Sequence, residues 1–323
     1  MTLVFRPVFR AFICLAIGSA ALLAGHSWAA DKIVVTTSFS ILGDLVRVVG
    51  GERVSVTNLV GPNEDAHVFV AKPSDAKSML QSRLLVSNGL GFDPWAQNLA
   101  QSAGYKGLAV VASKGLKPLA EVAQPATKSG AKGHDHGHSH SHGNSHGEAD
   151  PHAWQNPNNV VLYVRNITAA LSQLDPASAS NYQANANAYV QELQALDAWA
   201  KAQFSVIPAA QRKVITSHDA FGYLAVHYQI TFLSPQGIST EAQPSARDVA
   251  RLISQIQREK IRAVFLENMS NQRLLAQLSK DAGTTPGAKL YADALSAPDQ
   301  PGATYLRMMR HNVTQLAAGM RLN

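Results

Sequence analysis

Residues 175–204 read "DPASASNYQANANAYVQELQALDAWAKAQF", a long segment around which the rest of the chain is organised. Pro176 suits the first turn of a helix, where its missing N–H removes no hydrogen bond. A helix over residues 176–205 would be about 40 Å long at roughly 1.5 Å per residue, more than one small lobe needs. We therefore predict a spine helix that links two lobes; a surface helix of a single lobe is the alternative. Its apolar side chains recur at helical spacing: Tyr182, Ala186, Tyr189, Leu193, Leu196, Trp199 and Ala200.

Short β-rich runs alternate with helix-length segments on both sides of this helix. We predict strands at residues 32–39, 53–60, 83–89 and 107–113, and again at 212–216, 229–234, 262–267 and 288–292. The predicted helices cover residues 40–51, 72–81, 219–227, 245–259, 271–282 and 303–320. Such alternation is typical of parallel sheets covered on both faces. The predicted fold class is α/β, with lobes at residues 30–175 and 206–323, each a mostly parallel sheet flanked by helices, joined by the spine helix.

The first 29 residues have the three-part layout of a secretory signal peptide. Arg6 and Arg10 precede an apolar run over residues 11–24, and the tripeptide SWA at residues 27–29 places small residues at the −3 and −1 positions of a cleavage site. The run is too short for a membrane span. We expect cleavage after Ala29. Because residues 11–13 lack the small residue expected before a lipidated Cys14, we expect a soluble exported product.

The mature chain contains no cysteine, since Cys14 is the only one in the sequence. Roughly 290 residues are enough to bury two cores without disulfides. Any metal site must then use His, Asp, Glu or backbone oxygen. Removing the two arginines of the signal segment from the formal net charge of +6 leaves about +4. The basic residues are scattered, which argues against nucleic-acid binding.

A histidine tract, "GHDHGHSHSHGNSH", occupies residues 133–146. A run this polar cannot form a core, and imidazole is the commonest metal ligand in proteins. We expect the loop over residues 133–147 to bind metal weakly as an auxiliary to a tighter site; a dispensable linker with incidental metal affinity is the alternative. The histidines of the tract are His134, His136, His138, His140, His142 and His146.

Four side chains outside the tract are placed to bind a metal together. His67, His218 and Asp293 each follow a predicted strand, and His152 directly follows the tract. Ligands of open α/β sheets bind outside the carboxyl ends of strands, so these side chains converge only if the two lobes face one another. Each histidine alone would more often be a surface or capping residue. Their shared placement favours a metal site between the lobes.

Other polar residues near these positions have supporting or structural roles. Glu267 follows the strand at 262–267, where it would suit a general base in a catalytic site or, alternatively, a supporting carboxylate. His227 and His311 lie inside predicted helices and are expected to be structural. Three aspartates flank the ligand histidines and are expected to hold or cap them rather than to bind the metal: Asp65, Asp150 and Asp219.

Four motifs, in this order and spacing, resemble the metal-specific periplasmic solute-binding proteins of ABC importers, and most of all their zinc-uptake branch. The motifs are "DAHVFVAKPSD" (65–75), "DPHAWQNPNN" (150–159), "SHDAFGYLAVHY" (217–228) and "YADALS" (291–296). The resemblance covers essentially the whole mature chain. It implies two α/β lobes joined by one long helix, a periplasmic location, a membrane permease as partner, and four metal ligands: His67, His152, His218 and Asp293.

This chain departs from the family pattern at two points. The family usually has Asp-Pro-His at the first site, whereas Ala66 stands here in the place of the proline. Some members have a disulfide in the second lobe, which this chain cannot form. Neither departure removes a ligand. The zinc branch often carries a histidine-rich loop just before the second ligand, where the present tract stands.

Three imidazoles and one carboxylate suit a tetrahedral Zn²⁺ site. Manganese-binding relatives tend to carry a carboxylate where this sequence has His218, and manganese prefers more oxygen. We therefore expect a monomer that is not an enzyme and that carries Zn²⁺ as transported ligand to the permease. A manganese or broad divalent cargo stays open, as does loading by a periplasmic zinc chaperone.

Two interpretations from other classes remain. A secreted zinc hydrolase is disfavoured, because the HExxH and G-x-S-x-G patterns are absent and four protein ligands would close the site to water. A periplasmic zinc buffer without a membrane partner has no motif that distinguishes it from an importer component.

Overall fold

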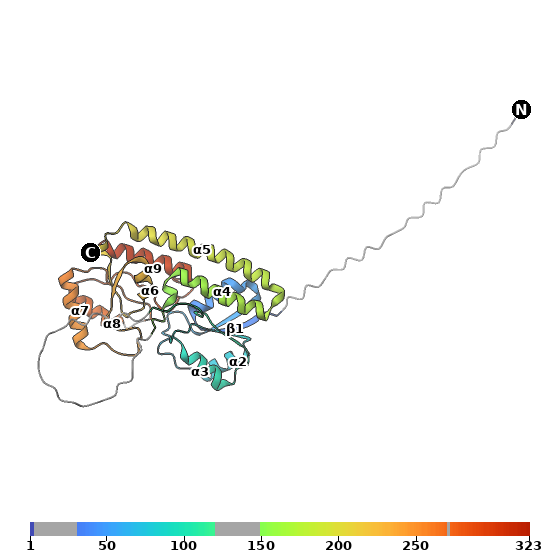
Figure 1. The fold of residues 1–323 in the computed structure, drawn as a ribbon, viewed down its shortest axis with the longest axis horizontal. Helices are drawn as coiled ribbons and strands as arrows, with labels where there is room; N and C mark the ends of the chain where they lie inside the picture. The colour runs from blue at the N-terminus through green and yellow to red at the C-terminus, as the bar shows by residue number, and fades with distance from the viewer. Residues whose placement is uncertain (3–30, 120–148, 270–271) are drawn as a thin grey trace. The chain divides into compact units, whose positions relative to one another are not determined.

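The computed structural model describes residues 1–2, 31–119, 149–269 and 272–323. Residues Lys32–Asn323 form one compact unit, drawn as the coloured ribbon of Figure 1. The predicted signal peptide, including Cys14, and the histidine tract lie outside the described residues. Among the helices that are described, none is long and apolar enough to cross a bilayer.

The first half of the unit is built on a parallel sheet of four strands. They are β1 (Ile33–Phe39), β2 (Val54–Val60), β3 (Leu84–Ser87) and β4 (Leu108–Val111), in the order β2-β1-β3-β4. In this register Val35 lies opposite Val56 on one side and Leu84 on the other. Every residue of β3 is buried, as expected where helices cover both faces of a parallel sheet. All four strands were predicted from the sequence.

Alternate side chains of β3 enter different apolar cores. Leu84 and Val86 face the core that also holds α1 (Ser40–Gly50) and α4 (Pro157–Leu174), whereas Leu85 packs with Met79 of α2 (Pro73–Gln81) and with α3 (Pro94–Ala103). Helices α3 and α4 were not predicted. The signals for α4 are nevertheless present, because Asn156 caps it, Pro157 opens it, and its buried residues have helical spacing: Val160, Tyr163, Val164, Ile167 and Leu171.

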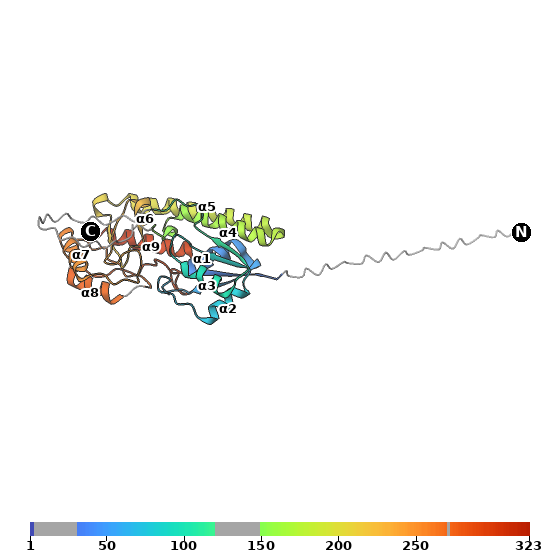
Figure 2. The ribbon, with the colours of Figure 1, turned by 60° about the horizontal axis from the view of Figure 1, so that its bottom comes forward.

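Helix α5 (Ala179–Ser205) confirms the predicted long helix. It has 27 residues and follows a 3₁₀ turn over Pro176–Ser178. It packs against α1 and α4 of the first half and against α9 (Tyr305–Met320) of the second; Figure 1 and Figure 2 both show it alongside α9. The helix is therefore shared by both halves, and the alternative of a surface helix confined to one lobe is wrong. Its predicted apolar stripe is buried except at Trp199, which is partly buried; the buried members are Tyr182, Ala186, Tyr189, Leu193, Leu196 and Ala200.

The second half is built around a smaller sheet. Strands β5 (Lys213–Ile215) and β6 (Thr231–Leu233) pair in parallel. Single parallel bridges join Ile215 to Val264 and Glu267 to Leu290. The helices of this half are α6 (Gly222–Tyr228), α7 (Ala246–Glu259), α8 (Gln272–Ala282) and α9.

The strands predicted at residues 262–267 and 288–292 are wrong as continuous strands. The first segment lies beside β5, since the Phe265 N–H donates to the Ile215 carbonyl at 2.9 Å, and the second lies beside the first, since the Leu290 N–H donates to the Leu266 carbonyl at 2.8 Å. At the start of the first segment, the N–H groups of Arg262 and Ala263 donate to the side-chain oxygen of Asn323, at 2.7 and 3.0 Å, and not to a neighbouring strand. The C-terminal residue thus takes the place of a neighbouring strand.

Direct hydrogen bonds also join the two halves. The Leu295 N–H donates to Ser40 Oγ at 3.0 Å, and the Tyr305 N–H donates to Asp44 Oδ2 at 2.8 Å. Both contacts connect α1 to segments more than two hundred residues away in the sequence. The lobe limits at residues 30–175 and 206–323 stay predictions.

Candidate metal centre

Four loops meet between the two halves, and each carries one of the predicted ligands. His67 lies in the loop after β2, and His218 lies in the loop after β5. Asp293 follows Leu290, the last bridged residue of the second half. His152 directly precedes the 3₁₀ turn Ala153–Gln155 that leads into α4. The placement after parallel strands is the usual one for ligand-binding loops in open α/β sheets.

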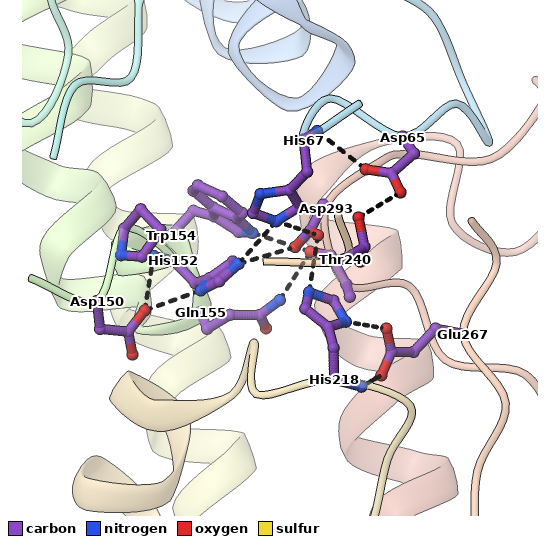
Figure 3. A network of polar contacts seen from close by, with 12 residues as sticks. Asp65, His67, Asp150, His152, Trp154, Gln155, His218, Thr240, Glu267 and Asp293 are labelled. Carbon is purple, nitrogen blue, oxygen red and sulfur yellow. Dashed lines mark hydrogen bonds and ion pairs between the residues drawn. The ribbon is translucent and has the colours of Figure 1, made fainter. Parts of the chain in front are cut away.

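The four side chains point toward a common centre, as Figure 3 shows. One ligand atom from each lies within 4.8 Å of every other. His218 Nε2 and His67 Nε2 lie 3.0 and 3.3 Å from Asp293 Oδ2. His152 Nε2 lies 3.4 Å from His67 Nε2. The geometry thus brings all four predicted ligands together.

The cluster is closed to solvent except at one residue. The side chains of His152, His218 and Asp293 are fully buried, and that of His67 is 6% exposed. Within the described part of the chain, neither oxygen of Asp293 nor His218 Nε2 has a hydrogen bond of acceptable geometry. A buried polar atom without a partner costs free energy. A divalent cation among these atoms would satisfy all of them at once.

Carboxylates behind two of the histidines turn their Nε2 atoms toward the centre. His152 Nδ1 lies 2.8 Å from Asp150 Oδ1, and His218 Nδ1 lies 2.5 Å from Glu267 Oε2. A carboxylate on Nδ1 keeps the proton there and leaves Nε2 as a metal-binding lone pair. Glu267 therefore lies on the far side of His218 from the cluster, a supporting position rather than that of a general base.

His67 and Asp293 are held through their backbones. The His67 N–H donates to Asp65 Oδ1 at 2.9 Å. Two side chains that follow His152 in the sequence, Trp154 through Nε1 and Gln155 through Nε2, donate to the carbonyl of Ala292 at 2.9 and 2.8 Å. Because Ala292 precedes Asp293, these bonds hold a ligand of the second half from the first half.

The charges of the cluster shift two pKa values in opposite directions. Burial acts to raise the pKa of Asp293, but the neighbouring His218 and His152 hold it well below its ordinary value. Burial acts to lower the pKa of His218, but Glu267 and Asp293 outweigh this effect and raise it well above its ordinary value. Both shifts favour a proton on His218 beside the Asp293 carboxylate in the metal-free cluster, and a divalent ion competes with that proton.

The remaining predicted residues lie elsewhere. His227 Nε2 lies 2.6 Å from Asp197 Oδ1, and His311 Nε2 lies 2.8 Å from the Lys289 carbonyl, so both have structural partners. Asp219 follows His218 in the chain, and its backbone N–H donates to the Gly237 carbonyl at 3.1 Å. The support expected from the Asp219 side chain stays a prediction.

Several residues of the site were not singled out from the sequence. Trp154 and Gln155 lie in the motif after His152, and that position was their only signal. Thr240 donates through Oγ1 to Asp65 Oδ2 at 2.7 Å. It lies in the polar stretch "SPQGISTEAQPSA" (234–246), which has no periodicity to indicate a role.

Comparisons with known proteins agree with this fold and with a metal-binding class. An iron-binding protein of Yersinia pestis is 32% identical over 290 residues, covering 90% of this chain and 87% of that protein. A manganese-binding lipoprotein of Halalkalibacterium halodurans is 29% identical over 316 residues, 98% of each chain. The periplasmic zinc binding protein TroA of Treponema pallidum has the same fold, with a TM-score of 0.79 at 24% identity over 90% of this chain and 99% of that one.

The two-lobe α/β fold, taken with these metal-binding relatives and the family model, places the chain in the class of metal-binding solute-binding proteins of ABC importers. The chain belongs to the family of zinc-uptake complex component A, periplasmic, whose model matches residues 35–319. The resemblance seen in the four motifs is thereby confirmed. So is the prediction that the chain is not an enzyme, because the class binds and delivers its ligand without transforming it.

Proposed function

We propose that this protein captures Zn²⁺ in the periplasm, as a monomer, and delivers it to the membrane permease of an ABC importer. The proposal rests on a buried cluster of three imidazole nitrogens and one carboxylate, that of Asp293. Among the described residues, neither oxygen of this carboxylate has a hydrogen bond. This donor set and number match a closed tetrahedral zinc site. A set richer in oxygen would suit manganese better.

A manganese or broad divalent cargo is the second candidate. It is favoured by relatives whose names give manganese or iron as the bound metal. Affinity alone cannot separate the two cargoes, because nitrogen-rich sites bind Zn²⁺ more tightly than Mn²⁺ in any case. The metal loaded in the cell is the deciding quantity.

Native mass spectrometry of the protein purified from its own periplasm without chelators tests the proposal. We expect the mass of the mature chain, cleaved after Ala29 and without lipid, plus one zinc ion. One manganese or iron ion in its place would overturn the zinc assignment while leaving the class intact. The same spectrum reports monomer or dimer, and a co-purified partner would indicate a chaperone.

Zinc affinity is expected to fall as the pH falls toward 5. The pKa of His218 lies well above its ordinary value of 6.5 in the metal-free protein, so protons compete with zinc throughout the neutral range. Each displaced proton weakens binding by about tenfold per pH unit. Competition titrations at several pH values check this, with circular dichroism showing that the metal-free fold persists.

Protonation of His218 has the opposite effect on the stability of the metal-free fold, which it increases. The attraction of protonated His218 to Glu267 and Asp293 stabilises that fold fully below pH 6.5 and is lost as the pH rises through the raised pKa.

The prediction for zinc binding would be contradicted by a zinc affinity that does not change with pH, because displacement of a proton from His218 makes the affinity depend on pH.

Deleting residues 133–146 is expected to remove weak zinc binding and to leave one tight event. The sequence of the tract offers no apolar residue that could fix its histidines in place, so we expect each of their sites to be weaker than the preformed one. We propose that the tract gathers or senses zinc for the cluster. Isothermal titration of the full chain and of the deletion variant distinguishes the two classes of event. Loss of the tight event would mean that the tract belongs to the main site.

A further inference from the structure

Both histidine ligands of the first half depend on an aspartate two residues earlier in the sequence. Asp65 Oδ1 accepts from the His67 N–H at 2.9 Å. Asp150 Oδ1 accepts from the His152 N–H at 2.9 Å and also lies 2.8 Å from its Nδ1. The position of each aspartate therefore fixes the position of its histidine.

Each of these aspartates is contacted by a residue of the second half. Thr240 Oγ1 donates to Asp65 Oδ2 at 2.7 Å, across 175 positions of sequence, as Figure 3 shows. The Tyr223 hydroxyl donates to the Asp150 carbonyl at 3.0 Å and accepts from the Leu119 N–H at 3.1 Å.

The helix that carries Tyr223 is also pressed against the Asp150 carboxylate. A Cβ at Gly222 would lie 2.3 Å from Asp150 Oδ2. No side chain fits there unless the carboxylate moves, and with it the hydrogen bond to His152. Glycine is therefore required at the start of α6 by contact with the support of a ligand, and not by its backbone angles.

Thr240 supports His67 through Asp65, and His67 lies at the partly exposed edge of the cluster. His67, the one partly exposed ligand, lines a cavity of about 460 Å³ together with Ile238 and Ser239, the two residues before Thr240. Trp95, from the first half, lines the same cavity. The Thr240–Asp65 bond thus joins the two halves beside a cavity that reaches one of the ligands.

We propose that Thr240 and Tyr223 are positioning residues that couple contact between the two halves to the alignment of His67 and His152. When the halves separate, both hydrogen bonds break, the two aspartates are released, and the histidines lose their alignment, so the ion dissociates. His218 differs, because Glu267, from its own half, supports it. His67 and His152 are therefore the first ligands to dissociate from the ion. This inference rests on the proposed function, since it describes how the same site holds and releases its ion.

The test is the rate of zinc release from the full chain into excess chromophoric chelator, measured by stopped flow. Thr240→Val removes the hydroxyl with little change in shape, and Tyr223→Phe removes the other one. We expect each to release zinc about tenfold faster, as for outer partners of metal ligands in general. Thr240→Ser restores the donor and is expected to restore the wild-type rate.

Matched controls separate positioning from general destabilisation. Thr314→Val and Tyr105→Phe remove hydroxyls that donate to carbonyls away from the cluster, and both are expected to keep the wild-type rate. Gly222→Ala displaces the Asp150 carboxylate without deleting any hydrogen-bonding group, whereas Gly237→Ala adds a methyl group with nothing within 4 Å. The first is expected to speed release and to alter the visible spectrum of bound Co²⁺; the second is not.

The outcomes are distinguishable. A wild-type protein that binds no Zn²⁺ tightly refutes the proposed function. If the wild type binds tightly but Thr240→Val and Gly222→Ala release zinc at its rate, the positioning role is refuted and the function stands. The role is likewise refuted if Thr240→Ser is as fast as Thr240→Val, or if the rates follow the melting temperatures of the metal-free variants.

Discussion

His218→Ala is expected to weaken zinc binding by more than about a hundredfold. Closed zinc sites contribute roughly 10–16 kcal/mol, so one ligand of four is worth about 3 kcal/mol, or a factor of more than about a hundred in Kd. The side chain of His218 is fully buried, so water has no direct path to replace it. Competition against a chromophoric chelator of known affinity measures the effect.

The matched control is His311→Ala, which removes a histidine that lies outside the cluster and whose Nε2 is 2.8 Å from the Lys289 carbonyl. It is expected to leave zinc affinity unchanged. Because removing His218 also leaves two carboxylates without their shared partner, the melting temperature of the metal-free variant must be measured as well. His67→Ala, at the edge of the cluster, provides a second ligand variant with less effect on the core. Wild-type affinity in a folded His218→Ala protein would show that His218 is not a ligand.

Asp293→Asn is expected to lower zinc affinity by a similar or larger factor, although it hardly changes the shape of the side chain. The carboxylate is the only anionic ligand of the cluster, and it approaches two of the three histidines within 3.3 Å. Without it, a doubly charged ion would have only neutral ligands, and a buried charge without an opposite charge in contact costs several kcal/mol. The predicted loss is therefore more than about a hundredfold in Kd.

Asp44→Asn is the matched control for this charge removal. Asp44 is also a buried carboxylate, and it accepts the Tyr305 N–H at 2.8 Å, outside the cluster. It is expected to alter the stability of the fold without altering zinc affinity. Tight zinc binding by Asp293→Asn would mean that the three histidines suffice and that the carboxylate serves another purpose.

The candidate ligands could be predicted because their chemistry is local. His67 and His218 follow recognisable strands, and the choice of donor atoms is restricted because the only cysteine, Cys14, lies in the predicted signal peptide. The supports Asp65 and Asp150 could also be predicted, since each is two residues from its histidine and bonds to the backbone of the same loop. Thr240 could not be predicted, because its partner is 175 residues away.

The long helix could also be predicted from the sequence, because its buried stripe from Tyr182 to Ala200 is a periodic pattern within one continuous segment. The strand predicted at residues 262–267 failed for the opposite reason. Its ladder depends on what lies beside it, and the side-chain oxygen of Asn323 accepts the N–H groups of Arg262 and Ala263. No local sequence pattern near Arg262 and Ala263 predicts that the distant Asn323 will accept their N–H groups.

Local residue chemistry thus specified which side chains could bind a metal, which segments form the helix α5 and the first sheet, and which aspartates support the nearest histidines. The meeting of His67, His152, His218 and Asp293 in one buried cluster was a matter of how the two halves pack. So were the partners of Asp65 and Asp150 across the interface. The reason is that periodicity and spacing act over a few residues, whereas a site with all ligand atoms within 4.8 Å of one another is assembled by the packing of segments far apart in the chain.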